Sequence, residues 1–348
     1  MQPVYLNDSE IRDHLFPFSQ VRSAADIRVG ILTIREKWEL LLGRPVQVVS
    51  GTEGLPEGAT VYAANIIPTK AFADSLEANQ ANPDWEAVKV VQYPWHIFQL
   101  NDWALREDFQ LLTQGRGSIP VPGTVHLINP ENIFIEEGAT LQHCILNAAT
   151  GPIYIGRNAE IMEGSLIRGP FALGEGAVLK MGTKIYGATT VGPYCVAGGE
   201  IKNSVMMGYS NKAHDGYLGD AVLGEWCNLG AGTSNSNLKN NASDVKVWHH
   251  PSEKYMAAGI KCGLLMGDYS RSAINTSFYT GTVVGVCANV FGDGIPPKFI
   301  PSFTWGTRGL SKYEFEKALT DIEAWKKFKH QSLTEAEIKR LRAIFEQS

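Results

Sequence analysis

The residues best suited to chemistry lie close together near the middle of the chain. The segment NKAHDGYLGDAVLGEWCNLGAGTSNSN contains His214, Tyr217, Asn228 and Asn237, and Lys202 precedes it by a few residues. An imidazole titrates near neutrality and is the usual general base for taking a proton from an attacking amine. Asparagine side chains and backbone amides can donate hydrogen bonds to a developing oxyanion. Lysine can hold a phosphate group. These residue types suit proton removal from a nucleophile beside a bound anion.

Each of these residues also has a plain structural interpretation. His214 could be a surface or core histidine without a function, and Lys202 could be a solvated charge between repeats. Asn228 and Asn237 could be turn residues, a role for which asparagine is well suited. The surrounding sequence of His214 favours function, whereas the alternatives stay open for Lys202 and the two asparagines.

Other polar residues of this region carry less information. Either Glu200 or Asp220 could orient the imidazole of His214, and sequence spacing does not choose between them. His249 and His250 are adjacent in a polar stretch, but HHPSE contains no further convincing ligand. A zinc site needs three or four such ligands, so we expect no metal there.

The elements that must position this segment are repeats of six residues. Aliphatic residues stand at Ile155, Ile161, Ile167, Leu173, Leu179, Ile185 and Val191, and the first six are each followed four positions later by a small residue or, once, by Phe171. The period resumes at Ile260, Met266, Ser272, Phe278, Val284 and Val290. Six fits neither the 3.6 residues of a helical turn nor simple strand alternation. It predicts a three-sided β-solenoid in which 18 residues make one coil, and hence a mainly β protein.

The central segment and the repeats resemble a known family. YLGDA, followed by NLGAGT, is similar to the acetyltransferase half of the bifunctional N-acetylglucosamine-1-phosphate uridyltransferase/glucosamine-1-phosphate acetyltransferase family. The similarity is specific over residues 199–240 and general over the repeats from 128 to 295. It implies a left-handed parallel β-helix of hexapeptide repeats, a homotrimer with active sites between subunits, and acetyl-coenzyme A as the acyl donor.

The resemblance also implies roles for individual residues. His214 matches the catalytic base of the family, and Asn237 matches its catalytic asparagine near the reacting amine. Lys202, Tyr217 and Asn228 match positions that bind the sugar phosphate.

One member of the family's set is absent. The family carries an arginine after a G-P-F-A stretch, whereas GPFALGEG places Leu173 and Gly174 there. We therefore expect acetyl transfer to an amino-sugar phosphate or a nucleotide sugar, in sugar-nucleotide or cell-envelope biosynthesis, without choosing the sugar. The alternatives are a sugar-1-phosphate nucleotidyltransferase whose β-helix only assembles the oligomer, and a non-catalytic scaffold, because a fold does not determine a function.

Residues 1–100 contain no repeats and predict a small α/β unit. Short buried strands are expected at 46–50, 59–63 and 88–92, and a helix is expected over 24–42. The glycine-rich G-x-G-T-R loop of sugar nucleotidyltransferases is absent. FPFSQVRSAADIRVGILTIREKWE and YPWHIFQLNDWALREDF nevertheless resemble sugar nucleotidyltransferases with a joined β-helix of the Bacteroidetes type. The resemblance implies a reduced nucleotidyltransferase-like domain, which would need Mg²⁺ only if it is active.

Four cations in this unit have two interpretations. Arg22, Arg28, Arg35 and Lys37 could form an anion-binding site. They could equally be the polar face of the predicted helix and its flanks.

The remaining segments complete the predicted organisation. Residues 101–124 form a helical linker, whose helix begins at an N-cap of Asn101 or Asp102 and stops at Gly115. The β-helix covers 125–306, and residues 307–348 form two helices that cap its open end or pack on a neighbouring subunit. The second of these begins at Thr334, with TEAE as a capping box. Between the two runs of sixes, the long polar stretch 236–254 suggests a loop with a purpose.

Composition excludes some functions. The net charge of −5 gives no electrostatic argument for nucleic acid or an anionic membrane. No apolar run reaches the roughly 20 residues that span a bilayer, and MQPVYLNDSEIRDHLF does not resemble a secretory signal. The five cysteines are scattered and never form CxxC: Cys144, Cys195, Cys227, Cys262 and Cys287. We expect them to be reduced and buried in a cytoplasmic protein whose partner is a small molecule.

Overall fold

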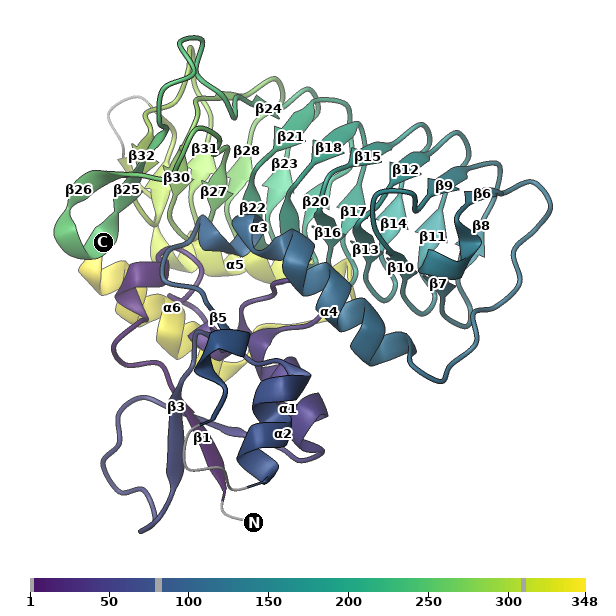
Figure 1. The fold of residues 1–348 in the computed structure, drawn as a ribbon. Helices are drawn as coiled ribbons and strands as arrows, with labels where there is room; N and C mark the ends of the chain where they lie inside the picture. The colour runs from purple at the N-terminus through teal and green to yellow at the C-terminus, as the bar shows by residue number, and fades with distance from the viewer. Residues whose placement is uncertain (1–2, 79–82, 308–310) are drawn as a thin grey trace.

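Three long sheets wrap around one apolar column in the computed structural model, which describes residues 3–78, 83–307 and 311–348. The result is the expected parallel β-helix, of about ten coils (Figure 1). The nine-stranded sheet consists of β7 (Ile133–Ile135), β10 (Ile153–Ile155), β13 (Phe171–Leu173), β16 (Thr189–Val191), β19 (Val205–Gly208), β22 (Val222–Glu225), β27 (Leu265–Met266), β30 (Val283–Val284) and β32 (Phe299–Ile300).

The other two sides of the prism follow the same order along the chain. The ten-stranded sheet consists of β8 (Thr140–Leu141), β11 (Glu160–Ile161), β14 (Val178–Leu179), β17 (Val196–Ala197), β20 (Asn211–Lys212), β23 (Asn228–Leu229), β28 (Arg271–Ser272), β31 (Asn289–Val290), β33 (Thr304–Trp305) and a final antiparallel β34 (Ser311–Lys312). The six-stranded sheet consists of β6 (His126–Ile128), β9 (Ile145–Asn147), β12 (Leu166–Arg168), β15 (Lys184–Tyr186), β18 (Glu200–Lys202) and β21 (Tyr217–Gly219), and β24 (Ser234–Asn235) pairs with β29 (Ser277–Phe278) on the same side.

The six-residue period correctly predicts the interior of the β-helix. All seven aliphatic residues of the first run are buried, and so are five of the six residues of the second run, among them Ser272 and Phe278. Ile260 is the exception, with 55% of its surface exposed. Ile260 belongs to the polar excursion and precedes the next coil. The coil resumes only at Leu265, whose N–H donates to the Thr282 carbonyl of the next coil.

The amino-terminal unit is built on a small parallel sheet. The central strand, β1 (Val4–Asn7), lies between β2 (Gln47–Val49) and β3 (Thr60–Ala63), while β4 (Ile66–Ile67) pairs with β5 (Lys89–Val90) and α2 (Lys70–Glu77) packs nearby. The three predicted strands are confirmed, but β1 was not predicted. Their expected burial is wrong for β5, both residues of which are exposed, and β2 and β3 are largely half-buried.

The helix predicted over 24–42 is wrong in its first half. Residues 24–26 form a single 3₁₀ turn, and Gly30 then adopts a φ of +84° in a tight turn that ends at Thr33. The helix α1 (Ile34–Leu42) begins only there. The Thr33 hydroxyl accepts from the Glu36 N–H, and the Glu36 carboxylate accepts from the Thr33 N–H.

The linker helix has the predicted length but not the predicted cap. After α3 (His96–Gln99), α4 (Asn101–Thr113) crosses the face of the nine-stranded sheet (Figure 1). The side chain of Asn101 is fully buried and accepts from the Gly30 N–H at 2.7 Å while donating to the Ala188 carbonyl at 3.0 Å. It therefore joins three segments instead of capping the helix. Gly115 follows the helix with a φ of +73°, as expected for a stop.

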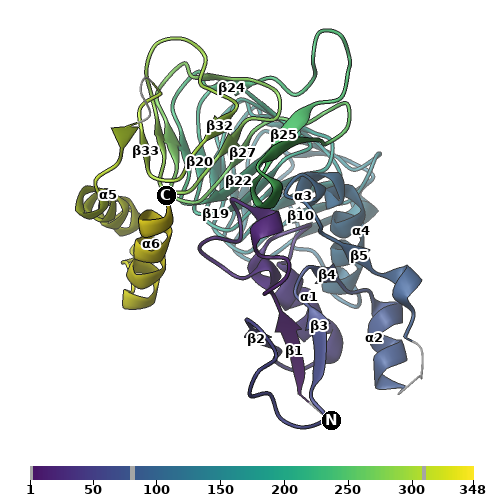
Figure 2. The same cartoon turned by 90° about the vertical axis from the view of Figure 1, so that its left-hand side faces the viewer.

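The long polar excursion is a hairpin that docks on the amino-terminal unit. Its strands β25 (Lys246–His249) and β26 (Lys254–Ala257) pair antiparallel. His250, at the turn, stacks on Phe16 with ring centroids 4.5 Å apart, and Trp248 stacks on Phe299 of the β-helix at 4.7 Å. The loop thus fastens the first unit to the last coils, as Figure 2 shows from the side.

The carboxyl-terminal helices follow the predicted pattern but lie along the flank of the β-helix. These are α5 (Phe315–Lys327) and α6 (Glu335–Gln347), and the capping box of Thr334 is confirmed. Their apolar faces pack on Trp226, Tyr269 and Phe303, at the edge between the nine- and ten-stranded sheets. All five cysteines are free and buried, as predicted. Within the described residues, no helix is long and apolar enough to cross a membrane.

One buried ion pair holds α1 against α4. The ammonium group of Lys37 contacts both carboxylate oxygens of Asp108, which also accepts from the Ile31 N–H at 2.7 Å. Burial raises the pKa of Asp108 and lowers that of Lys37, so each group depends on the other for its charge.

We predict that Lys37→Met lowers the free energy of unfolding by about 3 kcal/mol, because it leaves the Asp108 carboxylate buried without its partner. Lys70→Met is the matched control, since Lys70 pairs with Asp74 on the exposed face of α2 and should show no measurable change. Urea denaturation followed by tryptophan fluorescence measures both variants. Equal stability of the two would contradict the assigned role of the pair.

Candidate active site

His214 lies at a corner of the β-helix. It belongs to the four-residue turn 213–216 between β20 of the ten-stranded sheet and β21 of the six-stranded sheet, and its side chain is exposed. Neither predicted carboxylate orients it. Glu200 accepts from the Tyr186 hydroxyl at 2.5 Å, and Asp220 accepts from the Asn203 amide at 2.6 Å. Within the described chain, no group hydrogen-bonds the His214 ring, which is open to an outside partner.

Asn237 and Tyr217 are in direct contact. The Asn237 amide donates to the Tyr217 hydroxyl at 3.1 Å and to the carboxylate of Asp220, which is buried. Burial and the nearby Asp220 carboxylate raise the pKa of Tyr217, so its hydroxyl stays protonated as a hydrogen-bond donor. Asn237 stands 20 residues along the chain from Tyr217, and the coil geometry brings the two together.

Lys202 lies beside this pair on the neighbouring strand. The register of β18 with β21 places Glu200 opposite Tyr217 and Lys202 opposite Gly219. The Lys202 ammonium lies 5.6 Å from the centroid of the Tyr186 ring. A hydrogen bond to Glu200, together with burial, raises the pKa of Tyr186 to about 12. The six-stranded sheet thus presents the Lys202 ammonium among two phenols and a carboxylate, and exposed Lys184 lies opposite Glu200 on the adjoining strand β15.

Asn228 lies on another side of the prism. It belongs to β23, where it pairs with Asn211 on one side and Arg271 on the other. Within one chain, therefore, the structure brings together Lys202, Tyr217 and Asn237 on or beside the six-stranded sheet, with His214 at its edge, but not Asn228.

Leu173 and Gly174, which stand where the family has an arginine, lie on and beside the nine-stranded sheet. Leu173 points into the column and is fully buried. A side chain at Gly174 would place its Cβ 2.5 Å from the Pro193 nitrogen. The strand β13 to which Leu173 belongs is covered by α4, since Ala172 packs against Leu105 and Phe109. This part of the wall has no room for an arginine that faces solvent.

The four cations of the amino-terminal unit are engaged within the chain. Arg22 pairs with Asp268 at 2.6 Å and Glu225 at 3.0 Å, Arg28 donates to the Met207 carbonyl at 3.1 Å, Arg35 pairs with Asp26 at 2.8 Å, and Lys37 pairs with Asp108. Two of them, Arg22 and Arg28, connect the unit to the nine-stranded sheet. In the described structure these groups serve as links between elements.

The adjacent residues His249 and His250 make packing contacts within the chain. His249 Nε2 lies 3.2 Å from His14 Nδ1, and His249 Nδ1 lies 2.8 Å from the Ser252 hydroxyl. Burial, with His14 and His250 nearby, lowers the pKa of His249. Across residues 3–78, 83–307 and 311–348, no group of three or more histidine, cysteine or acidic side chains is arranged to hold a metal ion.

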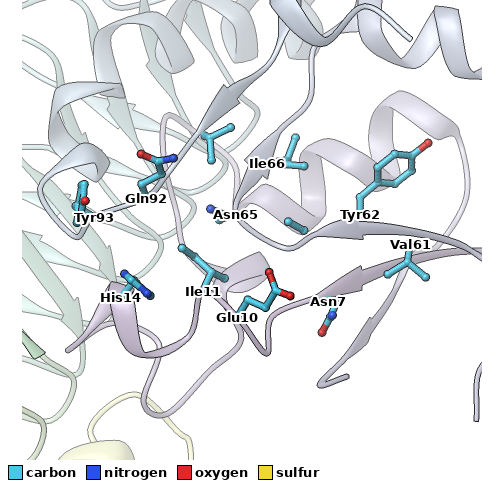
Figure 3. Close-up of a pocket in the computed structure, with 12 residues that line it drawn as sticks. Asn7, Glu10, Ile11, His14, Val61, Tyr62, Asn65, Ile66, Gln92 and Tyr93 are labelled. Atoms are coloured by element: carbon cyan, nitrogen blue, oxygen red, sulfur yellow. The ribbon is translucent and has the colours of Figure 1, made fainter. Parts of the chain in front are cut away.

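The structure also contains a cavity that the sequence did not reveal. It has a volume of about 620 Å³ and opens at the carboxyl ends of β1 and β3 (Figure 3). Its lining combines amides, aromatic rings and apolar residues: Asn7, Glu10, Ile11, His14, Val61, Tyr62, Ala63, Asn65, Ile66, Val90, Gln92 and Tyr93. None of these is a lysine or arginine. Ligands of open parallel sheets usually bind at this edge. The cavity could not be predicted because the sequence did not predict β1, the central strand of the sheet.

Comparisons with known proteins agree with both halves of this description. A family model for sugar nucleotidyl transferases matches residues 4–53 and 46–117. A bifunctional sugar-1-phosphate nucleotidylyltransferase/acetyltransferase of Sulfurisphaera tokodaii is 28% identical over 59% of this chain and 47% of its own length. The bifunctional protein GlmU of Methanocaldococcus jannaschii is 36% identical over 25% of this chain and 21% of its own length.

The similarity to these proteins is partial. The chain spans less than half the length of both relatives. Among solved structures, an Arabidopsis UDP-N-acetylglucosamine acyltransferase matches 66% of this chain and 90% of its own, with 14% identity and a TM-score of 0.28, which is too low to support an inference. The family model and the curated relatives together confirm the expected resemblance: the chain is similar to the GlmU-like bifunctional nucleotidyltransferase/acetyltransferase family.

Proposed function

We propose that this protein transfers an acetyl group from acetyl-coenzyme A to the amino group of an amino-sugar phosphate or a nucleotide sugar. The observation that carries the proposal is the hydrogen bond between Asn237 and Tyr217 beside Lys202, with His214 exposed in the turn that leads into the same strand, β21. The relatives named for acetyl transfer support it.

Each residue has a role that its chemistry suits. His214 takes the proton of the attacking amine, so that nitrogen can form its bond to the thioester carbonyl as the bond to the coenzyme A sulfur breaks. The amide nitrogen of Asn237 is held by Tyr217 and Asp220, which turns its carbonyl oxygen toward the amine. Lys202 and the Tyr217 hydroxyl bind the phosphate of the acceptor.

The proposed active unit is a homotrimer. Asn228 and the Tyr217 group face different sides of one prism, so a second subunit is needed to bring both types of residue to one substrate. Two exposed aliphatic residues, Ile145 and Leu166, are direct neighbours on the six-stranded sheet and lie in the same outward-facing row as Glu200 and Tyr217. An apolar pair in this place suits contact with another subunit.

We predict that sedimentation at micromolar concentration gives the mass of three subunits. Leu166→Arg should dissociate the trimer and remove acetyl transfer, because it places a charge in the contact. Leu40→Arg is the matched control, on the exposed side of α1, and should sediment as the wild type does. A stable, active monomer would contradict a shared site.

We predict that His214→Ala lowers turnover by about 10²- to 10⁴-fold, the usual contribution of one acid–base group. The KM for acetyl-coenzyme A should change little, since the base acts on the amine and not on the thioester. His330→Ala is the control, because His330 is an exposed histidine between α5 and α6, away from the six-stranded sheet. The assay is thiol release with a panel of amino-sugar phosphates and nucleotide sugars. If the two variants behave alike, the assignment of the base is wrong.

Nucleotidyl transfer in the amino-terminal unit is the second candidate function. The match to the sugar nucleotidyl transferase model and the cavity at the edge of its parallel sheet both favour it. The lining without lysine or arginine, and the absence of a glycine-rich loop between β1 and α1, argue for a reduced domain, because phosphates need such partners.

We therefore predict little or no pyrophosphate release when the protein is given a sugar-1-phosphate, a nucleoside triphosphate and Mg²⁺. The measurement is a coupled phosphate assay over all common nucleotides. Robust release, lost when Asn65→Leu fills the cavity, would make nucleotidyl transfer the main activity and would leave the β-helix as its assembly scaffold.

A further inference from the structure

A lysine lies inside the apolar column of the β-helix. Lys212 of β20 stands in register with Ala197 of β17, and by continuation with Leu229 of β23. Both of these neighbours point inward, and Lys212 is only 2% exposed. The core position that holds an aliphatic residue in the adjacent coils therefore holds a cation here. No carboxylate of the described residues lies within ion-pair distance of it.

The ammonium group of Lys212 is satisfied by main-chain carbonyls. It donates to the Gly198 carbonyl at 3.1 Å and to the carbonyl of His214. Burial lowers the pKa of Lys212 to about 8, with Asp215 partly opposing the shift. A buried cation is costly unless it gains specific contacts. Its two contacts are both at the corner that carries His214.

The same corner is packed closely against the coils on either side. A Cβ at Gly199 would lie 2.9 Å from the His214 carbonyl oxygen, and a Cβ at Gly216 would lie 2.1 Å from the Thr233 carbonyl oxygen. The turn 213–216 is thus confined between two neighbouring coils, while Lys212 holds it from the inside. The side chains of His214 and Asp215 are left to face outward.

We propose that Lys212 is a positioning residue, which fixes the main chain of His214 from within the β-helix and so sets the direction of the imidazole. The inference rests on the proposed function for its catalytic consequence, because His214 acts there as the base. It adds a residue that never touches the substrate. A displacement of about 1 Å at a reacting group can lower a rate by about 100-fold.

The test uses Lys212→Met in the full-length protein, because methionine keeps the aliphatic stem and removes the donors. We expect kcat for acetyl transfer to fall by at least about tenfold with the KM for acetyl-coenzyme A unchanged. Hydrogen exchange at the amides of residues 213–216 should become faster, while exchange in β20 and β21 stays as in the wild type. Lys254→Met, at the exposed hairpin, should change none of these values.

A second variant guards against misfolding. Lys212→Leu carries the residue found at this core position in the next coil, so it suits the column, and it should reproduce the effects of Lys212→Met. Gly199→Ala disturbs the turn from the neighbouring coil instead and should also lower kcat. Gly182→Ala is its control, since Gly182 has a similar φ of +69° but nothing within 4 Å of an added Cβ.

The outcomes separate the two proposals. Unchanged exchange at residues 213–216 in both Lys212 variants would overturn the positioning role, whether or not the wild type transfers acetyl groups. Faster exchange with unchanged kcat would overturn it as well, because the turn would then move without affecting the base. A wild type without acetyltransferase activity, but with faster exchange in the variants, would overturn the catalytic function and leave the structural link between Lys212 and His214 intact.

Discussion

Every coil of the β-helix must place an apolar side chain in the shared column while its strands pair with the coils above and below. This constraint determines where everything else lies. The strands can vary on their outer faces, and the length of a coil can vary at its corners, but each strand must return an inward residue to the column: Leu173 pairs with Val191, and Ile185 pairs with Ile201. A polar group that is needed at the surface must therefore be attached to a corner or to an outward position. Tyr217 and Lys202 occupy outward positions, and His214 occupies a corner.

The nine-stranded sheet has a different use from the other two sides. Its outward residues Val205, Val222, Leu265 and Val283 belong to the same core as the amino-terminal unit. The buried pair of Arg22 and Asp268 lies at the edge of this contact. The unit and the β-helix therefore share one apolar core and form a single body, which leaves the six-stranded sheet free for other contacts.

The features that could be predicted from the sequence are those that repeat. Inward residues such as Leu179 and Ile185 show the period directly, because each coil obeys the same rule as the next. The segment around His214 could be singled out only through a resemblance, and the roles that this implies for Tyr217 and Asn237 stay predictions. Features that depend on one contact between distant segments could not be predicted. In the sequence Asn101 looks like a helix cap, but in the structure its side-chain oxygen accepts a hydrogen bond from the N–H of Gly30, 71 residues earlier.

The shared core has a consequence for biosynthesis. The amino-terminal unit leaves the ribosome first, yet the sheet that covers its apolar face comes from residues 205–283, and the hairpin that fastens it spans residues 246–257. The apolar face of the unit therefore stays exposed to solvent until about two hundred more residues have been synthesised. Exposed apolar surface of this kind favours aggregation and chaperone binding during synthesis. The chain is therefore expected to depend on chaperones more than its regular, locally paired β-helix would suggest.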